Sequence, residues 1–434
     1  MRAIFYKDFQ QLRHNTAMLS ITIIAIAMSM LCIAVIPVIG IRNDAANALY
    51  QFAIITLGIC LAPTLSIDAI RSDLANGTIL TVRACGRPLR QYVIVQLVWA
   101  LIPITIASAI LTAFTYAVAP TLRSAILTPQ GIATACAPTL IAFALYIWSI
   151  CIKGKALLMT SSTLAPNNDT IGTDQVPAIR ITDMTFGYKR SKPVLEHINL
   201  DVPVGQSLGI LGYNGVGKTT LFGIITGLLR PQHGSAAINS NVFHSMREVF
   251  QLSDSGNLSP TMTIRENLKF RSMLYATHEN PHPIDMQHLN ELPMVQAFEL
   301  GEHLDKKVKD LSSGLRKRAG IVSGMLFDPK LILLDEPTNA VDPITRQLLV
   351  DLMKQLKANG RTILIITHDL EYCWEVTDRV IILDNKHLVK DCDISDFPNI
   401  DTFKQAATLG RERSNVNFGI TLSQPPCQGS WRRS

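Results

Sequence analysis

The stretch ILGYNGVGKTTLFGIITGLL, residues 210–229, decides how the second half of this 434-residue chain folds. An apolar run, SLGIL, leads into it and predicts a buried strand, and its last part, TTLFGIITGLL, predicts a helix. Between them, GYNGVGKT fits the pattern GxxxxGK[ST]. A chance glycine turn beside a lysine is the alternative, but the strand before it and the helix after it favour a loop that binds phosphate.

Each residue type in this loop has a physical reason to be there. Glycines let the backbone curl until successive amides point at phosphate oxygens, and the following helix N-terminus adds a positive dipole end. The lysine can reach the β and γ phosphates of a nucleotide, and the next hydroxyl can ligate Mg²⁺. The predicted nucleotide-binding residues are Gly212, Asn214, Gly215, Gly217, Lys218, Thr219 and Thr220.

A second apolar strand ending in two acids narrows the chemistry. In LILLDEPTNAVD, residues 331–342, Asp335 closes the predicted strand and Glu336 follows it. A carboxylate at Asp335 suits a Mg²⁺ ion held through water, and one at Glu336 suits polarisation of the water that attacks a phosphate. The two motifs together predict nucleotide hydrolysis.

With both motifs in order, residues 179–390 resemble the ATP-binding cassette (ABC) ATPases. The resemblance implies an α/β P-loop NTPase fold with antiparallel β and helical subdomains, and ATP and Mg²⁺ as cofactors. It also implies an aromatic that stacks on adenine, a glutamine that contacts metal and water, a loop aspartate and a catalytic switch histidine. These roles map to Tyr188, Gln251, Asp342 and His368.

The family's signature motif maps to LSSGL, residues 311–315, and departs from the common LSGGQ at two positions. In the family this segment begins a helix and touches the γ phosphate of ATP held by the other subunit. Ser312 and Gly314 keep the hydroxyl and the small residue that this contact needs. Ser313 adds a side chain where glycine leaves room, so we expect either slower turnover or one weakened site.

One chain carries one P-loop and one signature, and the resemblance places these on opposite halves of an ATP sandwich. The minimal active unit is therefore expected to contain two cassettes. A homodimer is the simplest arrangement. A heterodimer with another half-transporter remains open.

The first third of the chain is much more apolar than the rest. Four uncharged stretches are long enough to cross a hydrocarbon core of about 30 Å as helices. We therefore expect an all-α transmembrane region over residues 16–155, with spans at about 17–41, 48–67, 92–118 and 131–152. A buried helical core is the alternative, which four such long runs disfavour.

Basic residues orient these spans, because positive charge is retained on the cytoplasmic side. The N-terminus, the second connection and the exit carry nine Lys and Arg, whereas the other two connections carry only Arg42 and Arg123. The expected location is the cell membrane, multi-pass, with both termini cytoplasmic. The net charge of +6 then needs no nucleic acid to explain it.

Three shorter segments complete the organisation. Residues 1–15 mix apolar and charged residues at helical spacing and predict an amphipathic helix at the membrane interface. Residues 156–178 are polar and rich in turn formers, as a linker is, and residues 391–434 predict a largely disordered tail. The eight cysteines show no metal or redox spacing.

Residues 68–98 resemble the cytoplasmic coupling loop of ABC-type export permeases, through Gly77, Thr78, Pro88 and Arg90. Such permeases normally have six spans, and this chain shows four. The resemblance implies an ATP-driven exporter of an amphipathic drug, antibiotic or peptide, working with membrane lipid and a second half-transporter. The alternative is a membrane-tethered, weakly hydrolytic subunit that acts as a regulator or as the impaired half of a heterodimer.

Overall fold

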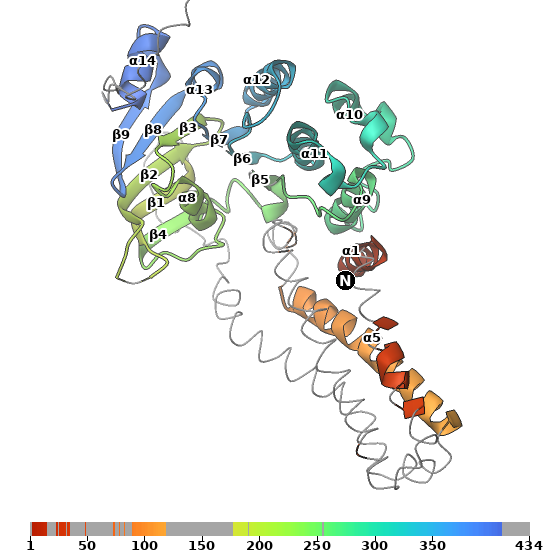
Figure 1. Cartoon of the computed structure of the whole chain (residues 1–434). Helices are drawn as coiled ribbons and strands as arrows, with labels where there is room; N and C mark the ends of the chain where they lie inside the picture. Colours follow the sequence, from red (N-terminus) through yellow and green to blue (C-terminus); the bar gives the residue numbers. More distant parts are fainter. Residues whose placement is uncertain are drawn as a thin grey trace, which may run out of the picture.

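The computed structural model shows an α/β cassette with an N-terminal helical part extending from it (Figure 1). The residues that it describes are 2–14, 23–24, 26–31, 33–34, 48, 73, 78, 82, 89–118, 177–189, 191–253 and 256–409. Most of the expected linker, more than half of the span at 17–41, all but one residue of the span at 48–67, the whole span at 131–152 and the tail beyond residue 409 lie outside these residues.

The main sheet of the cassette has six strands in the order β5-β6-β7-β3-β8-β9. The first five strands are parallel, and β9 pairs antiparallel to β8. Near-continuous apolar runs such as LILLD and TILII are typical of strands covered on both faces. The bounds are β3 Ser207–Gly212, β5 Val249–Leu252, β6 Leu331–Asp335, β7 Thr362–Ile366, β8 Arg379–Asp384 and β9 His387–Asp393.

A second, antiparallel sheet has the order β2-β1-β4, which confirms the expected antiparallel β subdomain. Its strands are β1 Pro177–Phe186, β2 Leu195–Pro203 and β4 His233–Ile238. Helix α8, Lys218–Ile225, follows β3, as the sequence predicts. Side chains from both sheets and α8, such as Ile198, Phe222 and Leu364, pack into one core.

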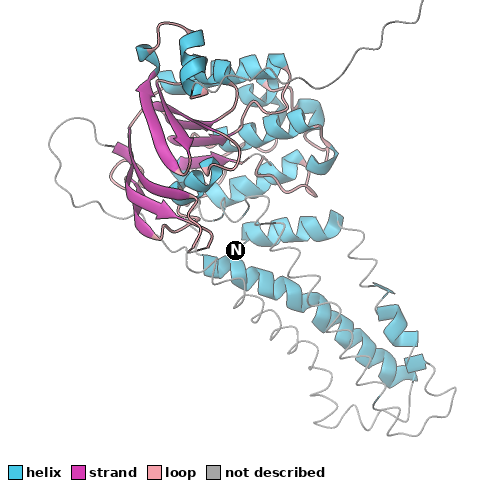
Figure 2. Cartoon of the chain, turned by 60° about the vertical axis from the view of Figure 1, so that its left-hand side comes forward, coloured by secondary structure: helices cyan, strands magenta, loops and turns pink. Residues whose placement is uncertain are grey.

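The helical subdomain lies on the other side of the cassette, as the separation of strands and helices in Figure 2 shows. Its helices are α9 Ile264–Tyr275, α10 Pro293–Ala297 and α11 Ser313–Met325. They share a core with the outer face of the main sheet and with α12, Pro343–Ala358. Short 3-10 turns precede β5, connect the helices of the subdomain and follow β9: η2 Met246–Glu248, η3 Leu289–Glu291, η4 Gly301–His303, η5 Val308–Asp310 and η6 Ile394–Asp396.

The prediction of a disordered tail from residue 391 is wrong for the first part of that segment. Strand β9 continues to Asp393, and a further helix, α14, spans Ile400–Ala407. Phe403 is 1% exposed and packs against Trp374, which belongs to α13, Leu370–Val376. Ile400 and Ala407 of α14 pack against the same cluster, and the polar composition around these few apolar residues hides that signal.

The N-terminal amphipathic helix forms, as α1 Arg2–His14, and packs against α9 of the cassette. Ile4 of α1 and Phe270 of α9 lie in one buried cluster. The amide nitrogen of the Gln11 side chain donates to Ser259 Oγ at 2.9 Å. The apolar face of α1 is therefore buried at least partly against protein. The amphipathic pattern of the sequence did not predict this contact with α9.

A buried ionic cluster joins α1 to helix α5, Leu89–Val118. The Lys7 ammonium pairs with Asp73 and Asp8, and all three are almost completely buried. Tyr92 of α5 donates to Asp73 at 2.7 Å, and Gln96 donates to Asp8 at 3.1 Å. Burial raises the pKa of Asp8 to about 6 although Lys7 opposes it. Removing one member of such a cluster would leave a buried charge without compensation, so Tyr92 and Gln96 tie α5 to the buried charges of α1 and Asp73.

Helix α5 covers the residues expected to form the third span. Among the described residues, no helix is both long enough and apolar enough to span a membrane.

Candidate functional site

A pocket of about 430 Å³ opens where β3 and β6 of the main sheet end. Two predicted loops meet there although β7 lies between their strands, because all the parallel strands of a sheet have their carboxyl ends at one edge. The predicted residues on its wall are Tyr188, Asn214, Gly215, Gly217, Lys218, Thr219, Thr220, Asp335 and Glu336. Sequence motifs 116 residues apart thus form one site.

The loop between β3 and α8 needs glycine at two positions. Gly215 and Gly217 have φ of 82° and 111°, in the left-handed region that favours glycine. A Cβ on Gly217 would also lie 2.9 Å from Leu195 Cδ2. Helix α8 begins immediately afterwards at Lys218, so its first amides face the pocket as a phosphate site requires.

Lys218 reaches back across its own loop. Its Nζ donates to the carbonyl of Gly212 at 2.7 Å and to that of Tyr213 at 3.3 Å. Partial burial lowers the pKa of Lys218, although Glu336 and Asp335 act against that shift. The ammonium is thus held at the centre of the loop, where it can exchange carbonyl oxygens for phosphate oxygens.

The donor set for Mg²⁺ is a hydroxyl and a carboxylate. Thr219 Oγ1 donates to Asp335 Oδ2 at 2.8 Å, so the two expected ligands already lie together. The Oε1 atom of Gln251, on the neighbouring strand β5, is buried without a hydrogen-bond partner among the described residues. Hard oxygen donors with few protein ligands suit Mg²⁺, which takes its remaining ligands from water and phosphate. These residues fit the ion.

Glu336 and His368 contact each other although 32 residues separate them. The backbone N–H of His368 donates to Glu336 Oε2 at 3.2 Å, and Glu336 Oε1 lies 3.2 Å from His368 Nε2. Glu336 has a φ of 49°, a costly conformation for a non-glycine residue that occurs disproportionately at functional sites. Its amide is fixed by the carbonyl of Ile366 at 2.9 Å.

The imidazole of His368 is neutral near pH 7. Burial lowers its pKa, and the positive charge of Lys218 lowers it further. A proton on Nε2 can be donated to Asn214 Oδ1, which lies 2.7 Å away. The contact with Glu336 is therefore a polar contact of a neutral ring, not an ion pair.

Tyr188 lies at the mouth of the pocket. Its ring is 68% exposed and meets Phe186 edge-on at 5.2 Å, while its hydroxyl lies 3.1 Å from Thr220 Oγ1. An exposed aromatic face held in this way can stack on a flat base. Val194, which no sequence motif identified, completes this wall.

The signature segment lies away from the described wall of this pocket. Ser312 caps helix α11, with its Oγ accepting from the Leu315 amide at 3.2 Å. Ser313 is exposed and is not among the residues with positive φ, so the chain's own backbone does not require glycine there. Leu315 packs against the core of the helical subdomain. Ser312 and Gly314 are thus presented at a helix N-terminus.

Asp342, the predicted loop aspartate, pairs with Arg318, which the sequence did not indicate as a site residue. Its carboxylate caps α12 through the Thr345 amide at 2.9 Å and pairs with Arg318 of α11 at 2.6 Å. These hydrogen bonds, with that of Thr345 as the largest cause, hold the pKa of Asp342 well below its usual range. Arg318 also pairs with Glu299 at 3.0 Å. The loop after β6 is therefore fixed to the signature helix.

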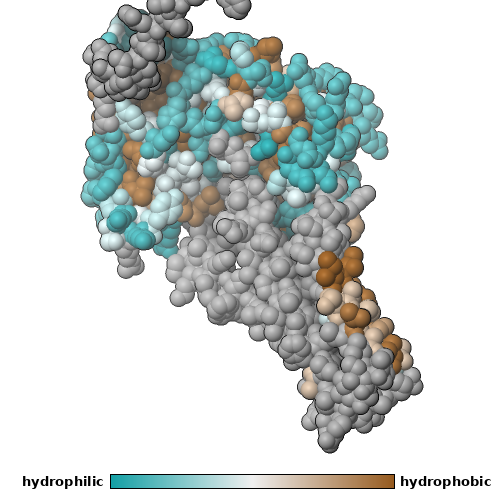
Figure 3. All heavy atoms as spheres, in the orientation of Figure 1, coloured by the Kyte–Doolittle hydropathy of each residue, from teal (hydrophilic) through white to brown (hydrophobic). Residues whose placement is uncertain are grey.

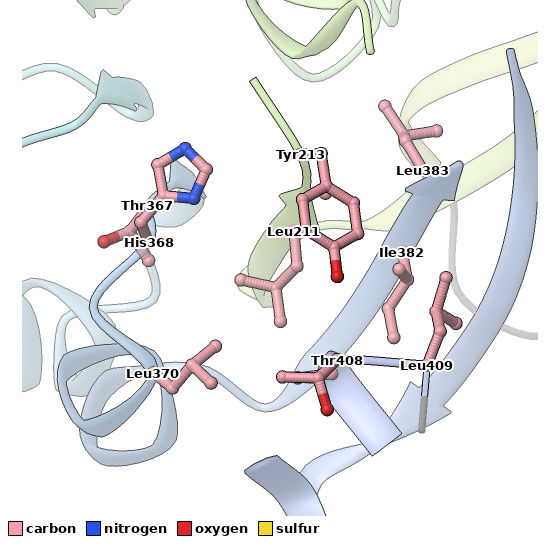
Figure 4. Close-up of a pocket in the computed structure, with 11 residues that line it drawn as sticks. Leu211, Tyr213, Thr367, His368, Leu370, Ile382, Leu383, Thr408 and Leu409 are labelled. Carbon is pink, nitrogen blue, oxygen red and sulfur yellow. The ribbon is translucent and has the colours of Figure 1, made fainter. Parts of the chain in front are cut away.

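A smaller hollow of about 170 Å³ lies behind the P-loop (Figure 4). Tyr213 and His368 flank it on one side, and Thr408 and Leu409 close it on the other. Its floor is apolar, with Leu211 from β3 and Ile382 from β8. Thr408 and Leu409, which follow α14, therefore line the same hollow as His368.

Comparison with known proteins agrees with this geometry. A family profile described as "ABC transporter" matches residues 195–339. The taurine import ATP-binding protein TauB of Jannaschia sp. (strain CCS1) is 32% identical over 48% of this chain and 76% of its own length. The Nod factor export ATP-binding protein I of Burkholderia orbicola (strain AU 1054) is 32% identical over 44% and 64%. The nickel import system ATP-binding protein NikE of Staphylococcus aureus (strain MSSA476) is 30% identical over 51% and 94%.

Proposed function

The chain belongs to the ABC transporter family, and from that premise we propose that it is an ATP-driven exporter whose motor is the cassette described above. The cassette is an ATPase that uses ATP and Mg²⁺, and ATP hydrolysis is coupled to transport. The observation that carries the residue assignments is the convergence of Lys218, Asp335 and Glu336 on one pocket beside His368.

The roles that we propose follow from the contacts. The P-loop amides and Lys218 bind the β and γ phosphates, and Tyr188 stacks on the base. Thr219, Asp335 and Gln251 would hold Mg²⁺, which neutralises phosphate charge. Glu336 accepts a proton from the attacking water, and the neutral His368 donates a hydrogen bond from Nε2 to the phosphate that is released.

We propose that the complete site contains two chains. ABC ATPases act as dimers, and here Ser312 is exposed and Gly314 is half-buried at the start of α11, and neither residue lines the pocket. A helix N-terminus whose capping serine can still donate its hydroxyl proton suits the γ phosphate bound by a partner cassette. The Arg318–Asp342 pair would keep the start of α11 and the loop after β6 in a fixed relation. A homodimer is the simplest assembly, with a heterodimer as the second possibility.

We propose that the N-terminal part lies in the cell membrane with both chain ends in the cytoplasm. Support comes from the four uncharged runs and from the distribution of Lys and Arg along the sequence. Large apolar side chains such as Ile94, Ile106 and Ile110 are also exposed along α5. Figure 3 shows apolar side chains gathered on the described surface of the N-terminal part. An exposed apolar surface of this kind is stable against lipid or another apolar surface.

Export of an amphipathic drug, antibiotic or peptide is the proposed direction and cargo. The matched relatives include both import and export proteins, so the proposal rests on the N-terminal position of the apolar region and on the loop at residues 68–98. The alternative is a membrane-tethered, weakly hydrolytic subunit. Its support is the second serine of the signature, at residue 313, and the small number of apolar runs.

An ATPase assay of the purified chain in lipid separates these two proposals. The exporter predicts vigorous hydrolysis that rises cooperatively with ATP concentration and increases when the transported compound is added. Hydrolysis near background in the chain alone, restored only by a second ABC protein, would support the tethered subunit and exclude the homodimeric pump.

A further inference from the structure

A groove of about 490 Å³ lies where the N-terminal helix meets the cassette, and it shares no lining residue with the nucleotide pocket. One wall is the start of α1, with Arg2 and Ile4, and the other is α9, with Lys269 and Met273. The chain after α9 closes the end with His282. Pockets of this volume between two structural units are typical small-ligand sites.

The charge on the wall has one sign. The ionisable side chains that the structure describes there are Arg2, Lys269 and His282. The Lys269 ammonium lies 5.0 Å from the centre of the Tyr6 ring, which fixes its position beside α1. Asp285 is close in sequence, but its carboxylate lies 2.7 Å from His288 Nδ1 and is not part of the wall. An occupant is therefore favoured if it carries negative charge.

The rest of the wall is apolar and adaptable. Ile4 and Leu274 are each 2% exposed, and two methionines, Met273 and Met286, border the same space. Methionine side chains adjust to flexible apolar ligands because they are unbranched and polarisable. The groove combines this surface with cationic groups, which matches a molecule with an acidic head and an apolar chain.

We propose that this groove binds an anionic phospholipid from the cytoplasmic leaflet and that the bound lipid strengthens the docking of α1 on α9. The inference rests on the proposed membrane location, because α1 directly precedes the first apolar run at residues 17–41. A lipid there contacts both helices at once. Since α1 also bonds to Ser259 of the cassette through Gln11, lipid occupancy biases how the cassette is held against the membrane region.

The test uses the full chain in nanodiscs of phosphatidylcholine, alone or with about one third phosphatidylglycerol. Two readouts are taken: the ATPase rate, and the number of phosphatidylglycerol molecules retained by the released protein in native mass spectrometry. The variants are Arg2→Gln with His282→Gln, which leaves the Lys269–Tyr6 contact intact, and Lys269→Gln. Lys354→Gln, on the exposed face of α12, is the charge-matched control.

We expect phosphatidylglycerol to raise the ATPase rate of the parent chain and the control, with one lipid retained per chain. Each variant should need roughly fivefold more phosphatidylglycerol for the same effect, the factor typical of one basic residue near an anionic surface. Equal retention by parent and variants would overturn the proposal. So would an identical effect from inorganic phosphate or octyl phosphate in phosphatidylcholine, since the groove would then take a free anion.

The failures are distinguishable. A chain that retains phosphatidylglycerol in a variant-sensitive manner but hydrolyses no ATP refutes the pump and leaves the lipid site standing. A chain that hydrolyses ATP with the same rate and retention in both lipids refutes the lipid site and leaves the pump standing. A chain that does not enter nanodiscs refutes the membrane location and the lipid site together.

Discussion

The P-loop pocket and the signature surface are built from the same cassette but differ in how complete they are. In the pocket, Lys218, His368 and Glu336 already contact one another or their own loop. On the signature surface, which comprises Ser312, Ser313 and Gly314, the Oγ of Ser312 accepts from the Leu315 amide of its own helix, and Ser313 is exposed. One region is an assembled half-site, and we propose that the other is a half-site whose counterpart belongs to a second chain.

The largest effect is expected in the pocket. Glu336→Gln removes the proposed base but keeps the size of the side chain, so hydrolysis should fall by about 100-fold or more while ATP still binds. The rate of phosphate release by the purified variant measures hydrolysis, and its affinity for ATP measures binding. Glu302→Gln, an exposed carboxylate on η4, is the matched control. A wild-type rate in Glu336→Gln would remove Glu336 from the mechanism.

The link between the signature helix and the loop after β6 comes next. Arg318→Ala breaks the 2.6 Å pair with Asp342 and should lower kcat roughly 10-fold, on the scale of a lost charge-assisted hydrogen bond, with little change in the KM for ATP. Arg318→Lys should recover part of the loss. Arg361→Ala breaks a similar pair with Asp328, also 2.6 Å, away from the site and should leave kcat unchanged. An equal loss of kcat in both alanine variants would show that Arg318 contributes only to the stability of the fold and not to the site.

The pH dependence sharpens the description of the pocket. Burial and Lys218 hold the pKa of His368 below the usual value of about 6.5, so the ring stays neutral as pH falls through that range and charges only in more acidic solution. Stability from this group is therefore full above about pH 6.5 and is lost as pH falls toward the lower folded pKa. NMR titration of the histidines checks this, with His368→Gln to assign the signal. A pKa above 6.5 would contradict the buried, neutral ring.

The smallest effect is expected on the signature surface. Because Ser313 is exposed and has no positive φ, Ser313→Gly should change the melting temperature little. It should raise the ATPase rate by no more than about twofold, since only the approach of the partner's phosphate is involved. A rise of 10-fold or more would identify the second serine as a brake.

The parts of the site that could be predicted depend on short covalent spacing. Lys218 and Thr219 follow a strand and glycines within a few residues, and Asp335 ends a strand that periodicity identifies. Their meeting then follows from the rule that parallel strands end at one edge of a sheet. The fold class of the cassette and most of its pocket were therefore accessible from the sequence.

What could not be predicted depends on contacts between distant segments. The pair Arg318–Asp342 joins two helices, and nothing in the spacing of 24 residues marks it. Helix α14 docks through the buried ring of Phe403, which lies in an otherwise polar region of the sequence. The packing of α1 on α9 joins residues more than 250 positions apart, and the amphipathic pattern alone does not say whether the apolar face meets lipid or protein.

The central claim is that the pocket of one chain is completed by the signature of another. The direct measurement mixes chains carrying Asn214→Cys with chains carrying Ser312→Cys, both with Glu336→Gln, and applies a short thiol cross-linker with and without ATP. Either variant alone is the control for native cysteines. We predict a cross-linked dimer only in the mixture and only with ATP. Cross-linking that is absent from the mixture but present within a single chain carrying both cysteines would contradict the account.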